Sequence, residues 1–199
     1  GTWQWNVKTN RIFCNEIQQR MWGYEPSDVV ADYSDGARLV VPEDLPVFEA
    51  AIRQCLQGAA NYDVEYRIKT FSKNEIRWIR STGKAFFNEK GEAVSIQGIS
   101  LDITERKKRE ERLRESEALL QGSIDALTKH IAVLDWQGRI INVNAAWRRF
   151  ADENSFGNQN YGIGSNYVEE CVDLMNNTEE GCDSFGNEAA EGIRQVLSE

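Results

Sequence analysis

Residues 62–69 read YDVEYRIK and alternate strictly between apolar and charged side chains. A period of two is typical of a strand with one buried face and one solvated face. Two further strand-like segments follow, at residues 75–87 and 94–103, and a polar turn at residues 88–91 separates them. We therefore predict three consecutive antiparallel strands.

In the last of these strands, the apolar residues move from one face of the strand to the other. Val94 and Ile96 share one parity, whereas Ile99 and Leu101 share the other. Gly98 stands at the change, and a glycine inside a strand often marks a bulge or a twist. We predict such an irregularity at this glycine.

The chain before these strands predicts a hairpin and a short helix. Strands at residues 2–7 and 11–15 are followed by a helix at residues 15–23, which carries Ile17 among its apolar positions and ends at Gly23. The strands alternate apolar and polar residues around a short turn, which is a hairpin pattern.

A second helix is predicted from Pro42 to a left-handed cap at Gly58. Proline suits the first helical position, and the acidic Glu43 and Asp44 favour the positive end of the helix dipole.

A highly charged segment follows the last strand over residues 105–127, with Thr104 as its cap. Leu113, Leu120 and Leu127 recur at intervals of seven, which is the spacing of a coiled-coil seam. We predict one helix that contributes to a parallel homodimer. A solvated helix that merely links two domains is the alternative interpretation.

The pattern of the first hairpin and helix then returns. Residues 131–135 and 139–144 repeat the strands, residues 145–151 repeat the helix, and Asn144 takes the place of Asn15. Such an internal repeat indicates two related units.

Nothing after this repeat corresponds to the three long strands of the first copy. Residues 167–175 and 188–197 predict helices instead. We therefore predict that the second copy is incomplete and that its strands form a ribbon, which is marginal in water unless another element covers it. The chain also begins inside an apparent strand, so we expect it to be part of a longer protein.

Several short motifs resemble those of the PAS family and occur in the family's order. They are Trp3-Gln4-Trp5-Asn6, Met21-Trp22-Gly23-Tyr24, Val41-Pro42-Glu43-Asp44, Glu65-Tyr66-Arg67, Ile76-Arg77-Trp78-Ile79 and Asp102-Ile103-Thr104-Glu105-Arg106-Lys107. The family usually has histidine at the position of Val41. The second copy resembles the front half of another PAS domain, through Asp135, Gly138 and residues 144–147.

The resemblance implies an α+β fold, with a five-stranded antiparallel sheet and helices on one face. It assigns residues 1–104 to a PAS domain with its PAC segment, residues 105–127 to a coiled-coil-like linker helix, and residues 128–199 to the N-terminal part of a second, incomplete PAS domain. It also implies a cytoplasmic input module of a two-component or related system. The output domain, a histidine kinase or diguanylate cyclase, would lie outside these residues.

PAS domains often hold haem, flavin or a small metabolite between the sheet and the helices. Haem iron commonly needs an axial histidine, and the only histidine, His130, belongs to the second copy. Cys14 and Cys55 lie outside the cysteine motif of the light-sensing flavin subclass. Both observations argue against these two cofactors.

A candidate cofactor pocket follows from the resemblance. Its inward-facing residues are Trp5, Tyr66, Ile79, Ser81, Ile96 and Ser100. Each aromatic side chain buries about 150–250 Å², so a self-packed core without a cofactor is our first interpretation. A non-covalent flavin or a small metabolite is the alternative.

Composition argues against several other functions. The net charge of −9 disfavours nucleic-acid binding, which needs a concentrated basic face. No apolar run approaches the roughly 18–20 residues that span a bilayer. The scattered cysteines and single histidine offer no zinc site. We find no nucleophile–base pair or phosphate-binding loop, and expect no catalysis by this segment.

Two functional hypotheses remain. The chain is either a sensory input module that responds to a ligand or relays a conformational signal, or a passive dimerisation module with ligand-free cores. A homodimer would form through the linker helix and the sheet surface. Trp78 and Arg67 on the outer sheet face either mark a docking surface or are covered by a flanking helix.

Overall fold

The computed structural model describes residues 1–25, 32–153, 160–167, 169 and 195. The internal contacts divide the chain into two units, Gly1–Arg112 and Leu113–Glu199. The helices predicted around residues 167–175 and 188–197 lie outside the described residues, apart from Tyr167, Glu169 and Gln195.

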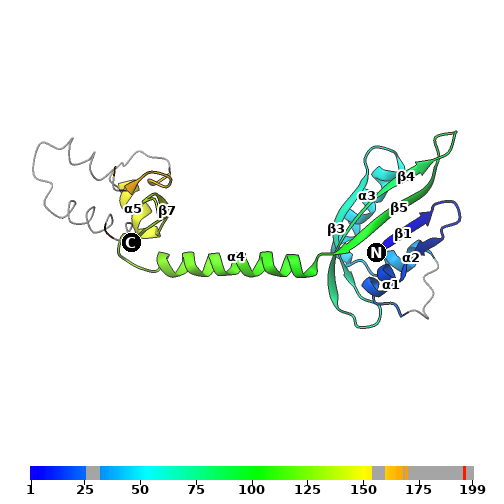
Figure 1. Cartoon of the computed structure of the whole chain (residues 1–199), viewed down its shortest axis with the longest axis horizontal. Coiled ribbons are helices and arrows are strands. Elements are labelled where there is room, and N and C mark those ends of the chain that lie inside the picture. Colours follow the sequence, from blue (N-terminus) through cyan, green and yellow to red (C-terminus); the bar gives the residue numbers. More distant parts are fainter. Residues whose placement is uncertain (26–31, 154–159, 168, 170–194, 196–199) are drawn as a thin grey trace, which may run out of the picture. The chain divides into compact units, whose positions relative to one another are not determined.

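The first unit is built on a five-stranded antiparallel sheet (Figure 1). Its strands are β1 (Thr2–Asn6), β2 (Ile12–Cys14), β3 (Tyr62–Lys69), β4 (Ile76–Phe87) and β5 (Ala93–Asp102). The strand order is β2-β1-β5-β4-β3, so the N-terminal hairpin pairs with the last strand of the unit. The predicted sheet is confirmed.

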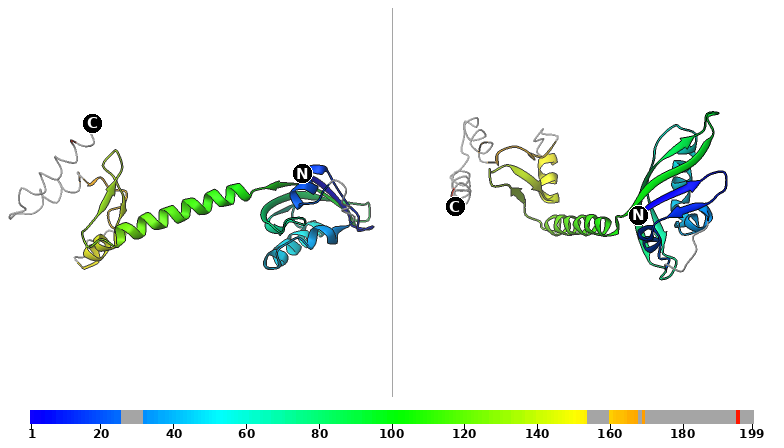
Figure 2. Two further views of the ribbon diagram at one scale, coloured as in Figure 1. Left: turned by 90° about the horizontal axis from the view of Figure 1, so that it is seen from below. Right: turned by 45° about the vertical axis from the view of Figure 1, so that its right-hand side comes forward.

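The helices of the first unit lie on one side of this sheet (Figure 2). They are α1 (Glu16–Trp22), α2 (Tyr33–Ala37), the 3-10 turn η1 (Pro42–Asp44) and α3 (Leu45–Leu56). The side chain of Asn15 caps α1 by accepting a hydrogen bond from the N–H of Gln18. Gly23 ends α1 in the left-handed conformation, with a φ of 84°, which glycine adopts without steric cost.

The start of the second helix differs from the prediction. Pro42 opens a 3-10 turn, and the α-helix itself begins at Leu45. The carboxylate of Asp44 does not cap this helix, because it accepts two hydrogen bonds from the guanidinium of Arg67 on β3. Sequence patterns within one helix carry no information on such a distant partner.

The core lies between the inner face of the sheet and the helices. Ile79 and Ile96 of the inner strands β4 and β5 and Ile68 of the edge strand β3 are almost fully buried, and Met21 and Phe48 of the helices pack in the same cluster. Burying one such side chain contributes about 1.5–3 kcal/mol. The helices and the sheet therefore stabilise each other mainly through these contacts.

The predicted bulge at Gly98 is wrong. The pairing of β4 with β5 continues without a shift through Gly98, and its one irregularity lies between Phe86 and Phe87. A side chain at Gly98 would collide with the carbonyl oxygen of Thr82 and with the ring of Trp3. The glycine is needed for close packing, not for a bend.

The change of apolar side along β5 has a different explanation. Ile99 and Leu101 are 58% and 62% exposed, whereas Ile96 is buried on the other side of the strand. These two residues therefore give the outer face of the sheet an apolar patch, while the inner face keeps its regular alternation.

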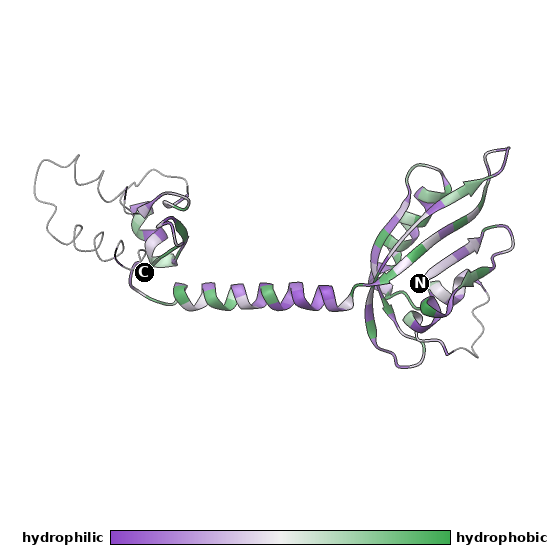
Figure 3. Cartoon of the chain, viewed as in Figure 1, coloured by the Kyte–Doolittle hydropathy of each residue, from purple (hydrophilic) through white to green (hydrophobic). Residues whose placement is uncertain are grey.

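Helix α4 (Thr104–Asp125) crosses the boundary between the two units. Its first turns are hydrophilic, and its last turns carry more apolar residues (Figure 3). The second unit continues with β6 (Ala132–Leu134), β7 (Ile140–Val143) and α5 (Ala145–Glu153). Strands β6 and β7 form a two-stranded antiparallel sheet, in the order that the internal repeat predicts.

Candidate functional site

A small internal cavity lies between the sheet and the helices of the first unit. Its volume is about 40 Å³, and aromatic side chains form most of its wall. Five of the six predicted pocket residues line it, namely Trp5, Tyr66, Ser81, Ile96 and Ser100. The sixth, Ile79, is fully buried in the adjoining core but does not line the cavity.

Hydroxyl groups run in a row along one wall of this cavity. A hydrogen bond of 3.1 Å joins Tyr66 Oη to Ser81 Oγ, and one of 2.7 Å joins Ser81 Oγ to Ser100 Oγ. Burial raises the pKa of Tyr66 to about 12. Burial also raises the pKa of Tyr62, a fourth hydroxyl that interacts with Tyr66. The wall is therefore neutral and can both donate and accept hydrogen bonds.

Aromatic rings make up the rest of the wall. Trp3 meets Tyr62 edge-on at 5.6 Å between ring centroids, and Phe48 meets Tyr66 at 4.8 Å. Trp5 is also one of the lining residues. None of the described lining residues carries a charge. The cavity thus suits an uncharged group, preferably a planar one.

The junction between the sheet and α4 forms a second candidate site. Asp102, at the end of β5, accepts hydrogen bonds from the N–H and the hydroxyl of Thr104. The hydroxyl of Thr104 also accepts a hydrogen bond of 3.0 Å from the N–H of Trp78 on β4. Asp102 therefore holds the start of the helix. Thr104 was predicted to cap the helix, but its hydroxyl bonds to β4 and so fastens the helix to the sheet.

Charged side chains extend this junction across the outer face of the sheet. Glu65 of β3 makes ion pairs with Lys107 at 2.7 Å and with Arg106 at 2.6 Å, both on the first turn of α4. The hydrogen bond from Lys107 is the largest of the effects that lower the pKa of the Glu65 carboxyl. The first turn of α4 is thus held to the edge strand β3 by the opposite charge of Glu65.

Trp78 lies between two cations of this network. The ammonium group of Lys107 is 5.0 Å from its ring centroid, and the guanidinium of Arg67 is 5.6 Å from it. Arg67 in turn makes an ion pair of 2.7 Å with Asp44, beside the start of α3. Of the two predictions for Trp78 and Arg67, the contacts favour coverage by a flanking helix. We name Asp44, Arg67, Trp78, Lys107 and Glu65 the junction network.

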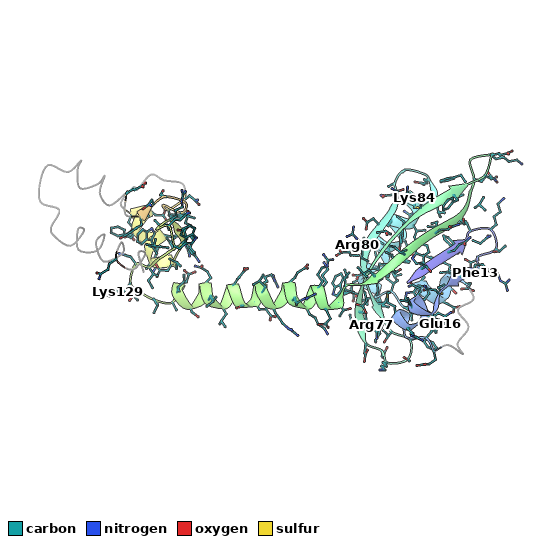
Figure 4. All side chains as sticks on the ribbon, in the orientation of Figure 1. Phe13, Glu16, Arg77, Arg80, Lys84 and Lys129 are labelled. Atoms are coloured by element: carbon teal, nitrogen blue, oxygen red, sulfur yellow. The ribbon has the colours of Figure 1, made fainter. Side chains whose placement is uncertain are left out.

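Basic residues of β4 lie close to this junction (Figure 4). Arg77 and Arg80 stand at the end of the sheet from which α4 leaves, and Lys84 lies farther along the strand. Arg77 donates hydrogen bonds to the carbonyl oxygens of Arg20 and Met21 at the end of α1. Helix α1 is therefore also tied to the junction end of the sheet.

In the second unit, the last turn of α4 is fastened to the repeated hairpin. Asp125 makes an ion pair of 3.0 Å with Arg148 and accepts a hydrogen bond of 2.6 Å from the N–H of Ala145 at the start of α5. The amide of Asn142 donates a hydrogen bond of 2.6 Å to Gln121 of α4. The two ends of α4 are thus each bound to the unit in which they lie.

Asn144 completes this attachment and explains its place in the repeat. Its side-chain oxygen accepts hydrogen bonds from the N–H groups of Ile131 and Trp147. The side chain of Asn15 makes the equivalent bonds with Thr2 and Gln18, at the same spacings along the chain. The predicted equivalence of the two asparagines is confirmed at the level of hydrogen bonds.

The described part of the chain offers neither a metal cluster nor a membrane-spanning helix. No group of three or more histidine, cysteine or acidic residues there is arranged to hold a metal ion. No helix among those residues combines the length and the apolar character that a membrane span requires.

Comparison with known proteins identifies the first unit. Residues 11–100 match the PAS fold family. The chain is 33% identical to a sensory box histidine kinase/response regulator from Burkholderia thailandensis E264 of known crystal structure, over 60% of this chain and 88% of that one, with a TM-score of 0.54. The first unit is a PAS domain.

Curated relatives indicate the kind of protein in which this domain occurs. A probable diguanylate cyclase, DgcE of Escherichia coli, is 31% identical over 146 residues, which are 72% of this chain and 13% of that protein. The sensor protein FixL of Bradyrhizobium diazoefficiens is 29% identical over 140 residues, 70% of this chain and 27% of that protein. The chain is thus a PAS sensory input module, a regulatory kind of domain, and it spans about a quarter or less of these relatives.

Proposed function

We propose that this module passes a conformational signal from its PAS domain through α4 to an output domain of the histidine kinase or diguanylate cyclase type. The PAS domain would cover residues 1–104 and the linker helix residues 105–127. The output domain would lie in the same polypeptide, outside residues 1–199. The relatives support this arrangement, because they include a sensor protein and a probable diguanylate cyclase.

The junction network is the observation that carries this proposal. Asp44 stands next to α3, and α3 contributes Phe48 and Ile52 to the cavity wall. A displacement of α3 moves Asp44, and the ion pair with Arg67 transmits that movement to Trp78 and Lys107. Charge-assisted hydrogen bonds of this kind hold a defined geometry. A change in the cavity can therefore alter how firmly the first turn of α4 is held.

Amide exchange of the 199-residue chain tests this relay. Replacing Glu65 by glutamine removes the charge that pairs with Lys107 and Arg106. Because exposed ion pairs are modest in energy, we expect exchange in residues 105–110 to accelerate by about three- to fivefold. Asp63→Asn is the matched control, because Asp63 lies on the same strand but pairs with Arg80 of the sheet. Equal exchange of the helix in wild type and both variants would refute the relay.

We further propose that residues 128–199 are the N-terminal part of a second PAS domain. The equivalent hydrogen bonds of Asn15 and Asn144, and the matching order of hairpin and helix, support this assignment. A tandem arrangement would place α4 between two sensory domains, where it could pass a signal from one to the next.

The module is also proposed to act as a parallel homodimer through α4 and the sheet surface. Leu113 and Leu120 of α4 are 61% and 66% exposed, so each can pack against a second copy. Leu127, the third leucine of the predicted stripe, lies beyond the end of the helix at Asp125. With Leu113 and Leu120 at the core positions of a parallel pair, Arg112 and Glu117 occupy flanking positions that pair between chains. Ile99 and Leu101 supply the apolar patch on the sheet.

Sedimentation velocity checks the dimer directly. Leu120→Lys should shift the chain towards monomer, because it places a charge in the apolar seam. Ala118→Lys, on the other side of the helix, is the control and should leave the association unchanged. A wild-type chain that stays monomeric at high concentration would exclude the dimer without affecting the relay.

A passive, ligand-free module is the second candidate function. The volume of the cavity favours it, since about 40 Å³ is far below the 300–1,000 Å³ of usual ligand pockets. The visible absorbance of the purified protein is the first measurement: a flavin or haem spectrum would exclude the passive module, whereas a colourless protein would support it over a coloured cofactor.

A further inference from the structure

An open groove lies on the surface beside the internal cavity. Its volume is about 510 Å³, and it is lined by Trp5, Tyr33, Glu49, Ile52, Arg53 and neighbouring residues of α3. Trp5, Tyr33 and Ile52 also line the cavity. The two spaces therefore share these three side chains.

The partition between them is a pair of stacked rings. The rings of Trp5 and Tyr33 lie 4.7 Å apart at an interplanar angle of 29°. Both side chains are half-buried. The indole N–H of Trp5 donates a hydrogen bond to Asn10, which fixes that ring on the hairpin. Tyr33 comes from α2, so a rotation of its ring would join the cavity to the groove.

The groove differs from the cavity in charge. Glu49 and Arg53 stand one turn apart on α3, both exposed, and within the described residues neither forms an ion pair. Residues at this spacing lie on the same face of a helix. Glu49 lines the groove together with Tyr33 and Trp5, and burial, followed by the charge of Glu49, raises the pKa of Tyr33 to about 12. The groove therefore presents one negative and one positive group beside the aromatic pair.

We propose that groove and cavity form one binding site for an aromatic zwitterion of the amino-acid class. With the ring of Tyr33 rotated away from its present stack on Trp5, the aromatic ring of the ligand would stack on Trp5 beside the neutral, aromatic cavity. Its carboxylate would face Arg53, and its ammonium group would face Glu49. Stacking on tryptophan and tyrosine rings favours a planar group, and the two charges of the groove match the two charges of the ligand. This inference rests on the proposed sensory function.

Calorimetric titration of the 199-residue chain with L-phenylalanine and L-tryptophan tests the proposal. We expect both to bind, and L-leucine, which has no ring, to bind about tenfold more weakly or not at all. Phenethylamine lacks the carboxylate and 3-phenylpropionate lacks the ammonium group, so each should lose about fivefold in affinity. No heat with either aromatic amino acid, or equal affinity for L-leucine, would overturn the proposal.

Charge reversal in the groove identifies the residues that bind the zwitterion. Arg53→Glu and Glu49→Arg should each weaken L-phenylalanine binding by about fivefold or more. The double reversal restores one charge of each sign and should recover most of the affinity, with the ligand turned round. Arg20→Gln, an exposed arginine on α1, is the control. Single reversals that leave the affinity unchanged would refute the assignment of these groups.

These outcomes are separate from the test of the relay. The Glu65→Gln exchange experiment contains no ligand and depends only on the junction network. A failed titration combined with faster exchange of α4 would reject the zwitterion site and leave the relay standing.

Discussion

Asn15 and Asn144 organise the same hairpin and helix in the two units of this chain, yet the two units are completed differently. In the first unit, β3, β4 and β5 extend the hairpin to a five-stranded sheet with a buried core. In the second unit, the described residues contain a two-stranded sheet, and the end of α4 contacts it. The amide of Asn144 donates to the carbonyl oxygens of Ile124, Leu127 and Lys129 at that end.

The comparison shows that the same hairpin and helix can form in both units although different elements pack against them. Two backbone N–H groups, one of the hairpin and one of the helix, donate to the side-chain oxygen of one asparagine in each unit. A two-stranded sheet is marginal on its own, so stability depends on the covering element. In the first unit, β3, β4 and β5 extend the hairpin into a larger sheet. In the second unit, the end of the linker helix contacts the hairpin, and this is the helix that would carry the signal.

The largest expected effect comes from the core of the first unit. Ile79 is fully buried, and Ile79→Ala should lower the free energy of unfolding of that unit by about 4 kcal/mol, through lost burial and the cavity left behind. Ile99→Ala, on the exposed outer face, is the control and should cost less than about 1 kcal/mol. Urea unfolding followed by tryptophan fluorescence measures both. Similar losses would mean that the sheet is buried on both faces.

The two asparagines provide the most direct comparison of the units. Asn144→Ala removes five hydrogen bonds of a fully buried side chain and should cost about 3 kcal/mol. Asn15→Ala removes a helix cap and one further bond, and should cost about 1–2 kcal/mol. Thermal unfolding with unit-specific amide exchange separates the two losses. A larger effect at Asn15 would contradict the anchoring role of Asn144.

Alkaline pH should destabilise the first unit selectively. Burial raises the pKa of Tyr66 to about 12, against about 10 in an unfolded chain. The neutral phenol is favoured in the folded state, so its contribution is fully present below pH 10 and is lost as the pH rises towards 12. The melting temperature should therefore fall over that range, and less steeply in Tyr66→Phe. An identical pH dependence in the variant would show that Tyr66 is not the responsible group.

A smaller, stabilising effect is expected at Gln18. This side chain is fully buried, and among the described residues its amide atoms have no hydrogen-bond partner. Gln18→Met keeps the approximate shape and removes the unsatisfied groups, which should stabilise the first unit by about 1 kcal/mol. Gln19→Met, at the next position of α1, serves as the control. Destabilisation by Gln18→Met would show that the amide has a partner, such as a bound water.

Local patterns predicted the strands of both units and most of their helices, but not α2 or the contacts that link the elements. Strict alternation located β3, and the repeated asparagine located the second hairpin. The pairing of Asp44 with Arg67 and of Glu65 with Lys107 could not be predicted, because each joins residues far apart in the sequence. The collisions that require Gly98 arise from the backbone of Thr82 and from the ring of Trp3, which is almost a hundred residues away in the sequence.

The candidate pocket shows the same limit. The family resemblance placed five of its six residues on the cavity wall, because strand parity decides which side chains face inward. It did not reveal the neighbouring groove, since Glu49 and Arg53 on α3 meet Trp5 and Tyr33 only when the helices pack on the sheet. Sequence alone identified the inner surface and missed the groove beside it.

Amide exchange of the whole chain, resolved along the sequence, tests the central account most directly. We predict slow exchange in β3, β4 and β5, faster exchange in β6 and β7, and protection of α4 at the turns that hold Lys107 and Asp125. This pattern would show one complete PAS domain joined through an anchored helix to an incomplete repeat. Equal protection of both units, in a chain shown by sedimentation to be monomeric, would contradict it.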